Sequence, residues 1–72
     1  MLWVYILQSA ANGSFYVGQT NNLQARVEAH NRGKVRSTRR YKPWKLVYSE
    51  PYATRQEATR REREVKGRKK RV

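Results

Sequence analysis

The chain has 72 residues, enough for one small domain with a modest core, and it contains no cysteine, which excludes disulfides and zinc–thiolate sites. Seventeen Lys and Arg against five Glu give a formal net charge of +12, and residues 32–72 contain sixteen of those bases. Such a field attracts polyanions, so nucleic acid is the first partner to consider, ahead of an anionic membrane surface. No apolar run is long enough to span a membrane and no signal-peptide pattern opens the chain, so we expect a cytoplasmic protein.

The first two expected elements are strands over residues 2–8 and 14–19. Both segments are rich in β-forming side chains, and each contains one tyrosine. The dipeptide Asn12-Gly13 lies between them and is a common turn signal. The pattern therefore predicts a β-hairpin at the start of the chain.

The register of this hairpin has two possibilities. A two-residue turn at residues 12–13 would pair Tyr5 with Thr20 and set the two tyrosines well apart along the sheet. A longer loop, shifted toward Ser9, would place Tyr5 opposite Tyr16. The sequence leaves both open, and a site shared by the two tyrosines needs the second arrangement.

A helix is expected after the hairpin, because the asparagines at 21–22 can cap its start and Gly33 is a good terminator. Three side chains with the spacing i, i+4 and i+7 define one face of this helix: Leu23, Val27 and His30. Arg26 comes four residues before His30, so the two side chains share a side of the helix.

The second half of the chain starts with a basic, irregular stretch over residues 34–42. A third strand is expected over residues 44–49, and Pro51 is expected to end it. Thr54 is a candidate cap for a second helix over residues 55–66.

This second helix has a carboxylate on its apolar face. Its only apolar stripe is Ala58 and Val65, and Glu62 falls between them on the same side. A carboxylate that faces a core needs a partner. By itself this position favours an ion pair with an arginine such as Arg26, and a role in a site is the alternative.

The element order β-β-α-β-α predicts an α+β fold with a small three-stranded antiparallel sheet flanked by helices. We expect one domain over residues 1–72. Its last segment, residues 67–72, is expected to be a frayed basic tail that starts at a glycine.

Together these segments resemble the GIY-YIG nuclease superfamily, and within it the small stand-alone bacterial proteins of the UPF0213 group. Five segments carry the resemblance in the family's order: Trp3-Val4-Tyr5, Tyr16-Val17-Gly18, residues 22–31, residues 44–48 and residues 58–66. Each motif is weak alone, but five in order over nearly the whole chain are specific. Trp3 stands where the first motif of the family has glycine.

The resemblance implies a metal-dependent phosphodiester hydrolase. Glu62 would bind the metal, Mg²⁺ or else Mn²⁺, and the lack of aspartate suits a site with one carboxylate and several waters. Arg26 would contact the scissile phosphate, and His30 would assist proton transfer or bind phosphate. Tyr5 would be the general base or would position the water, with a pKa lowered by nearby cations, and Tyr16 would hydrogen-bond in the same site.

Each of these residues also has a purely structural interpretation. Tyrosines are ordinary strand residues, a lone histidine is more often structural than catalytic, and Arg26 can pair with Glu28 or Glu62. Weaker candidates for the site are Thr20 and Lys66. Four further bases are expected to form a phosphate-binding surface: Lys34, Arg36, Arg39 and Arg40.

The expected function is that of a Mg²⁺-dependent endonuclease that hydrolyses DNA with low sequence specificity. Four aromatic residues alternate with the bases of the second half, and this mixture suits single-stranded or branched DNA: Tyr41, Trp44, Tyr48 and Tyr52. No membrane partner and no small-molecule cofactor are expected. The alternative is a non-catalytic nucleic-acid-binding module on the same fold.

Overall fold

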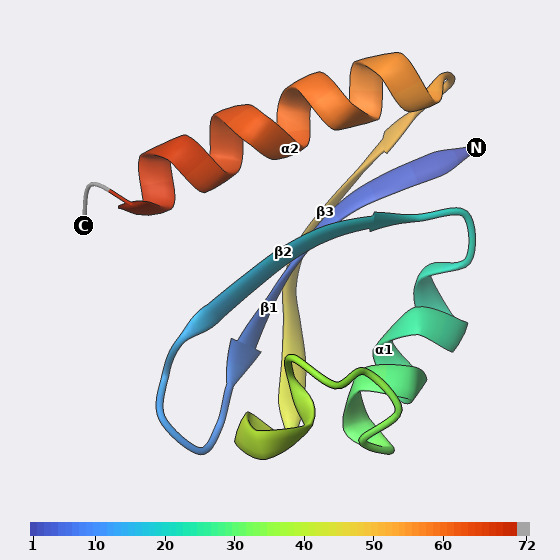
Figure 1. The fold of residues 1–72 in the computed structure, drawn as a ribbon. Helices are drawn as coiled ribbons and strands as arrows, with labels where there is room; N and C mark the ends of the chain where they lie inside the picture. Colours follow the sequence, from blue (N-terminus) through green and yellow to red (C-terminus); the bar gives the residue numbers. More distant parts are fainter. Residues whose placement is uncertain (71–72) are drawn as a thin grey trace.

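A computed structural model describes the backbone of residues 1–70 and the side chains of residues 1–67. It contains three strands, two α-helices and one short 3-10 helix (Figure 1). The elements in chain order are β1 (Leu2–Ser9), β2 (Phe15–Thr20), α1 (Leu23–Asn31), η1 (Arg39–Tyr41), β3 (Trp44–Tyr52) and α2 (Arg55–Lys70). The strands form one antiparallel sheet in the order β2-β1-β3, which confirms the expected α+β fold and element order.

The two faces of the sheet are covered by different helices (Figure 1). Strand side chains alternate between faces, so the core divides into two clusters. On the α2 side, Val4, Val17 and Ala58 are buried, and Val65 packs against them. On the α1 side, the buried residues are Tyr5, Leu7 and Trp44, and they contact Leu23 and Val27.

The hairpin adopts a register between the two that the sequence allowed. Tyr5 lies opposite Gly18, and Leu7 lies opposite Tyr16. The reason is the loop: the Ser9 carbonyl accepts from the Gly13 amide at 2.9 Å, so the turn is longer than two residues. Tyr5 and Tyr16 are therefore diagonal neighbours on one face, with ring centroids 6.3 Å apart.

Helix α1 begins and ends where its sequence predicts. The Asn22 side chain accepts a hydrogen bond from the Ala25 amide at 3.1 Å, which caps the first turn. Gly33 has a φ of +78°, a left-handed conformation that glycine adopts at little cost and that follows many helix ends. His30 is fully buried in the last turn and faces the sheet.

Strand β3 is longer than expected. It continues through Pro51 to Tyr52, so the prediction that Pro51 ends the strand is wrong. β3 pairs only with β1 and is an edge strand, with Pro51 opposite Trp3. Proline is tolerated on an edge strand because one side of the strand needs no amide donor.

Helix α2 starts at its predicted cap and runs past its predicted end. Thr54 accepts from the Glu57 amide at 3.2 Å, as expected for a cap. The helix continues through Gly67 to Lys70, so the expected end near Lys66 is wrong, while fraying of the basic tail stays a prediction. Gly67 does not adopt a positive φ, and the strong helix formers around it outweigh its penalty of about 1 kcal/mol. Residues 71–72 lie outside the described residues.

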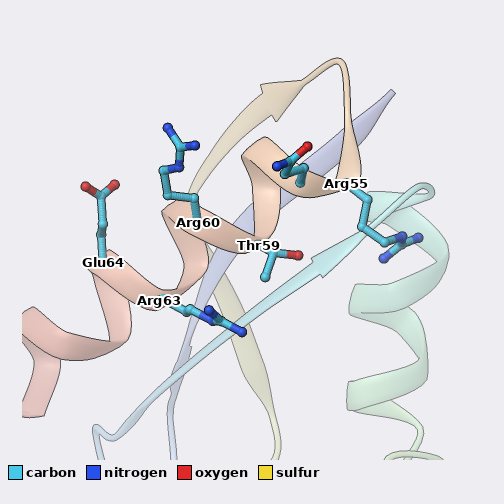
Figure 2. Close-up of a pocket in the computed structure, with 6 residues that line it drawn as sticks. Arg55, Thr59, Arg60, Arg63 and Glu64 are labelled. Carbon is cyan, nitrogen blue, oxygen red and sulfur yellow. The ribbon is translucent and has the colours of Figure 1, made fainter.

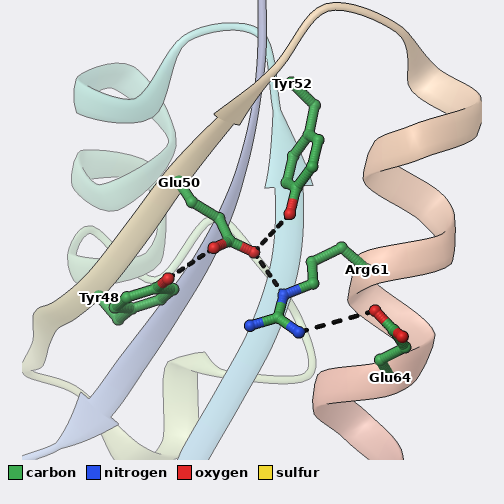
Figure 3. A network of polar contacts seen from close by, with 5 residues as sticks. All are labelled: Tyr48, Glu50, Tyr52, Arg61 and Glu64. Carbon is green, nitrogen blue, oxygen red and sulfur yellow. Dashed lines mark hydrogen bonds and ion pairs between the residues drawn. The ribbon is translucent and has the colours of Figure 1, made fainter.

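A polar network ties α2 to β3 (Figure 3). The Glu50 carboxylate accepts from the hydroxyls of Tyr48 and Tyr52 at 2.5 and 2.8 Å and from Arg61 Nε at 2.5 Å. Arg61 also contacts Glu64 at 3.6 Å. The hydrogen bond from Tyr48, together with those from Tyr52 and Arg61, holds the pKa of Glu50 below its usual value. This network orients α2 against the far edge of the sheet.

Helices long and apolar enough to cross a membrane are absent from the part of the chain that the structure describes.

Candidate active site

Tyr5 and Gly18 form the floor of the candidate site. Tyr5 is only 1% exposed, and its ring lies across Gly18 on the neighbouring strand. A Cβ at position 18 would come within 2.7 Å of the Tyr5 hydroxyl and 3.1 Å of the Tyr16 ring. Glycine is therefore required at this position because the two phenols occupy the space of a side chain.

His30 joins the two tyrosines from α1. Its Nε2 lies 3.1 Å from the Tyr5 hydroxyl, and its Nδ1 lies 2.7 Å from the Thr38 hydroxyl. The His30 ring also packs on Tyr16, with centroids 4.8 Å apart. Burial, and after it the charge of Arg26, lowers the pKa of His30. The imidazole is consequently neutral at pH 7 and can accept a proton on one nitrogen.

Tyr5 does not have the low pKa expected of a phenolate base. Burial raises its pKa and outweighs the hydrogen bond with Arg26, which acts in the opposite direction. The expectation that nearby cations lower the pKa of Tyr5 is therefore wrong, because desolvation is the larger effect. At neutral pH the hydroxyl is protonated and can donate to His30 Nε2.

Arg26 is an exposed cation of α1 that interacts with Tyr5 and Tyr16. Its side chain is exposed, and hydrogen bonding to Tyr5 raises its pKa, with smaller contributions from Tyr16. Neither of the ion pairs considered from the sequence forms: Glu28 contacts Arg32, and Glu62 contacts Lys66. Arg26 is thus a cation on the surface of the site, available to an anion.

Glu62 lies on the other side of β2, held by the residue that follows Gly18. Gln19 donates from Nε2 to Glu62 Oε1 at 3.1 Å and to the Thr59 hydroxyl at 3.0 Å. Lys66 contacts Glu62 Oε2 at 2.7 Å. The Glu62 side chain is 17% exposed, and its charge contributes to the raised pKa of Tyr5. The adjacent residues Gly18 and Gln19 therefore place the tyrosine cluster and the carboxylate on the two faces of one edge strand.

Comparison with known proteins decides the family. A model of the GIY-YIG catalytic domain matches residues 1–71. The chain belongs to the GIY-YIG family. Its domain is thus of a nuclease type, and endonuclease activity on DNA is the activity that this membership supports.

Small bacterial proteins are the relatives found. UPF0213 proteins of Staphylococcus aureus strains Mu3 and N315 are 45% identical to this chain over 65 residues, which cover 89% of this chain and 78% of each relative. The solution NMR structure of a UPF0213 protein from Bacillus halodurans has a TM-score of 0.56 and 38% identity, and it covers 93% of this chain and 72% of that one. These matches confirm the resemblance to the UPF0213 group.

GIY-YIG nucleases typically use a divalent metal ion, and Glu62 is the carboxylate that the sequence analysis predicts to bind it. Among the described side chains, no group of three or more His, Cys, Asp or Glu could hold an ion, so the donor set does not suit zinc. Mg²⁺ accepts one carboxylate and keeps several waters. The Glu62 carboxylate is paired with the half-exposed Lys66 ammonium, four residues along the same helix, and a metal ion would take the place of that ammonium.

The remaining GIY-YIG site candidates occupy different places. Thr20 exchanges hydrogen bonds with the Asn22 backbone at the start of α1 and lies outside the tyrosine cluster. Lys66 is the ion-pair partner of Glu62. The four basic residues proposed as a phosphate-binding surface are all exposed, and none pairs with a carboxylate in the described chain: Lys34, Arg36, Arg39 and Arg40.

Two residues that touch the site were not among the sequence candidates. Gln19 orients Glu62, and Thr38 contacts His30. Gln19 follows the second motif directly, and its alternation with Gly18 could have placed it on the face of Glu62. Thr38 carries no such signal, because it lies in an irregular segment among bases.

A shallow pocket lies along α2, partly on the side that faces β2 (Figure 2). Six polar or charged residues line it, three of them arginines: Arg55, Gln56, Thr59, Arg60, Arg63 and Glu64. Arg60 and Arg63 form no ion pair with any carboxylate among the described residues. Thr59 and Arg55 both contact Gln19, so this basic surface adjoins the residue that holds Glu62.

We expect Gly18→Ala to damage both stability and activity. The new methyl group collides with Tyr5 and Tyr16, which are held by packing, and overpacking of this kind costs about 1–3 kcal/mol. Urea unfolding measures the first effect and a cleavage assay the second. Gly67→Ala is the matched control, since nothing lies within 4 Å of its Cβ position and alanine favours a helix. If Gly18→Ala were as stable and as active as Gly67→Ala, the two phenols would not need the space at position 18.

Proposed function

We propose that this chain is a metal-dependent endonuclease that hydrolyses DNA phosphodiesters with low sequence specificity. The observation that carries the proposal is the convergence at β2. Gly18 admits the Tyr5–His30 pair beside Arg26, and the next residue, Gln19, holds Glu62. A nuclease of this type needs a proton acceptor, a cation for the phosphate and a carboxylate for the metal, and each has one candidate here.

Proton transfer would run through Tyr5 to His30. The attacking water gives a proton to the Tyr5 oxygen while the phenol proton passes to His30 Nε2, which lies 3.1 Å away. Because the two protons move together, no free phenolate has to form, and the raised pKa of Tyr5 is compatible with the step. His30, with its lowered pKa, is ready as a neutral acceptor at pH 7.

Arg26 would bind the scissile phosphate. Its exposed side chain interacts with Tyr5, so a phosphate bound to the guanidinium would be held near the Tyr5 hydroxyl. A guanidinium fixed beside the reacting group stabilises the charge that grows on the phosphate. Glu62 would hold the metal, which when bound supplies further neutralisation of that charge.

The flanking phosphates would bind on one or both of two basic surfaces. The first is the segment of Lys34, Arg36, Arg39 and Arg40, next to α1 and η1, and the second is the α2 pocket with Arg60 and Arg63. Both would read the backbone rather than the bases, which suits low sequence specificity. The exposed ring of Tyr48 and the many lysines and arginines in the second half of the chain favour single-stranded or branched DNA as substrate.

Salt dependence separates the two surfaces. Replacing Arg39 and Arg40 by Gln should lower the slope of log affinity against log salt by about 1 to 2, because fewer counterions are released. The same measurement on Arg60→Gln/Arg63→Gln tests α2, with EDTA present so that no DNA is cut. Arg32→Gln/Lys45→Gln, with two charges removed elsewhere, is the control. A slope equal to the wild-type value in a double variant would remove that surface from the DNA path.

The function itself is tested by a cleavage assay at low salt. Labelled single-stranded, double-stranded and branched DNA are incubated with the protein, with Mg²⁺ or with EDTA. We expect cutting only with Mg²⁺, fastest on single-stranded or branched DNA. If the folded chain binds DNA but does not cut it, a non-catalytic nucleic-acid-binding module is supported instead. In such a module Lys66, and no metal ion, would be the partner of Glu62.

A further inference from the structure

Thr38 is a buried side chain in an otherwise exposed basic segment. It is 1% exposed, whereas Arg36, Arg39 and Arg40 around it are exposed. Its hydroxyl lies 2.7 Å from His30 Nδ1 and donates to the Val35 carbonyl at 3.3 Å. Its carbonyl accepts from the Trp44 indole at 2.8 Å. Two of these hydrogen bonds hold the Thr38 hydroxyl beside the buried histidine, and the third fixes its backbone.

The hydrogen bonds of Thr38 set the direction of this chain of groups. The Thr38 hydroxyl has one proton and donates it to the Val35 carbonyl, so its oxygen accepts from His30, and His30 Nδ1 carries the ring proton. A neutral ring protonated on Nδ1 has its lone pair on Nε2, which then accepts from the Tyr5 hydroxyl 3.1 Å away.

We propose that Thr38 is a positioning residue, which holds His30 in the Nδ1–H tautomer and so keeps the lone pair of Nε2 directed at Tyr5. The partner of the second ring nitrogen decides which nitrogen can accept a proton. The same hydroxyl fixes the basic segment to the site. The arginines proposed to bind phosphate are therefore held next to His30, the proposed proton acceptor. The kinetic consequence rests on the proposed function, but the tautomer does not.

The chain has a single histidine, which makes the test direct. Nitrogen-15 NMR of the imidazole distinguishes a protonated from an unprotonated ring nitrogen, and no other histidine overlaps. We expect wild-type protein at pH 7.5 or so (about one unit above the usual histidine pKa) to show protonated Nδ1 and unprotonated Nε2. A protonated Nε2 in the wild type would overturn the proposal before any variant is made.

Thr38→Val keeps the shape and removes the hydroxyl, and Thr38→Ser restores it. The valine variant should lose the Nδ1–H preference, and its cleavage rate should fall about 10- to 100-fold at unchanged DNA affinity, as for other groups that orient a reactive ligand. The serine variant should recover both. An unchanged tautomer in folded Thr38→Val would contradict the role of Thr38. Absence of cleavage by the wild type would refute the proposed function and leave the tautomer result standing.

Discussion

Glu62→Ala is expected to reduce Mg²⁺-dependent cleavage by about 1,000-fold or more, since the lost metal contributes several kcal/mol of charge stabilisation at the phosphate. DNA affinity should stay the same or rise, because the variant removes a negative charge from the surface that meets the phosphates. The fold should persist, because Glu62 is partly exposed and alanine is the best helix former. Single-turnover cleavage and binding titrations in EDTA measure the two quantities separately.

Glu64→Ala is the matched control for this experiment. Glu64 lies on the same helix and points away from the sheet, with a contact to Arg61 at 3.6 Å (Figures 2 and 3). Because Glu64 also lines the α2 pocket, the variant is compared at saturating protein, where its single-turnover cleavage rate should equal that of the wild type. Persistent Mg²⁺-dependent cleavage by Glu62→Ala would show that the metal is held elsewhere, and equal loss in both variants would point to damage to α2.

Tyr5→Phe is expected to slow cleavage by about 100- to 10,000-fold, the usual contribution of a positioned acid–base group. The variant keeps the ring that packs over Gly18 and removes only the hydroxyl that contacts His30. It leaves His30 Nε2 without that partner, so stability should fall by about 1–3 kcal/mol without loss of the fold. Cleavage rates and urea unfolding, measured on the same preparation, separate the two effects.

Tyr48→Phe controls for the loss of a phenol in general. Tyr48 is exposed, and its hydroxyl contacts Glu50 on the opposite face of the sheet (Figure 3). Its cleavage rate should change far less than that of Tyr5→Phe. A Tyr5→Phe rate close to wild type would remove Tyr5 from proton transfer, and the general base would have to be sought at Tyr16 or in solvent.

Most of the fold follows from local signals in the chain. The caps at Asn22 and Thr54, the positive φ at Gly33 and the alternating strands are short-range features, and the structure contains each of them. The two errors in element boundaries have one origin. Pro51 and Gly67 are breakers by type, but an edge strand tolerates the first and a run of strong helix formers the second.

The candidate site was predictable only as far as its motifs reach. Tyr5, Arg26 and Glu62 stand out by type and spacing, and the family match supports looking for a nuclease among them. The pKa of Tyr5 was not predictable, because it depends on how deeply the phenol is buried. Gln19 and Thr38 were missed, because their importance comes from what they touch: a carboxylate 43 positions away in one case and a histidine eight positions away in the other.

The sequence by itself determined the element order, the basic second half, the family and the residue types available for chemistry, since these depend on composition and on spacing along the chain. Only the tertiary structure decided the register that makes Tyr5 and Tyr16 diagonal neighbours over Gly18, and which partner each polar group finds. The physical reason is that a turn sets register through its hydrogen bonds. A pairing between distant side chains, in contrast, is selected by the packing of the whole sheet against its two helices.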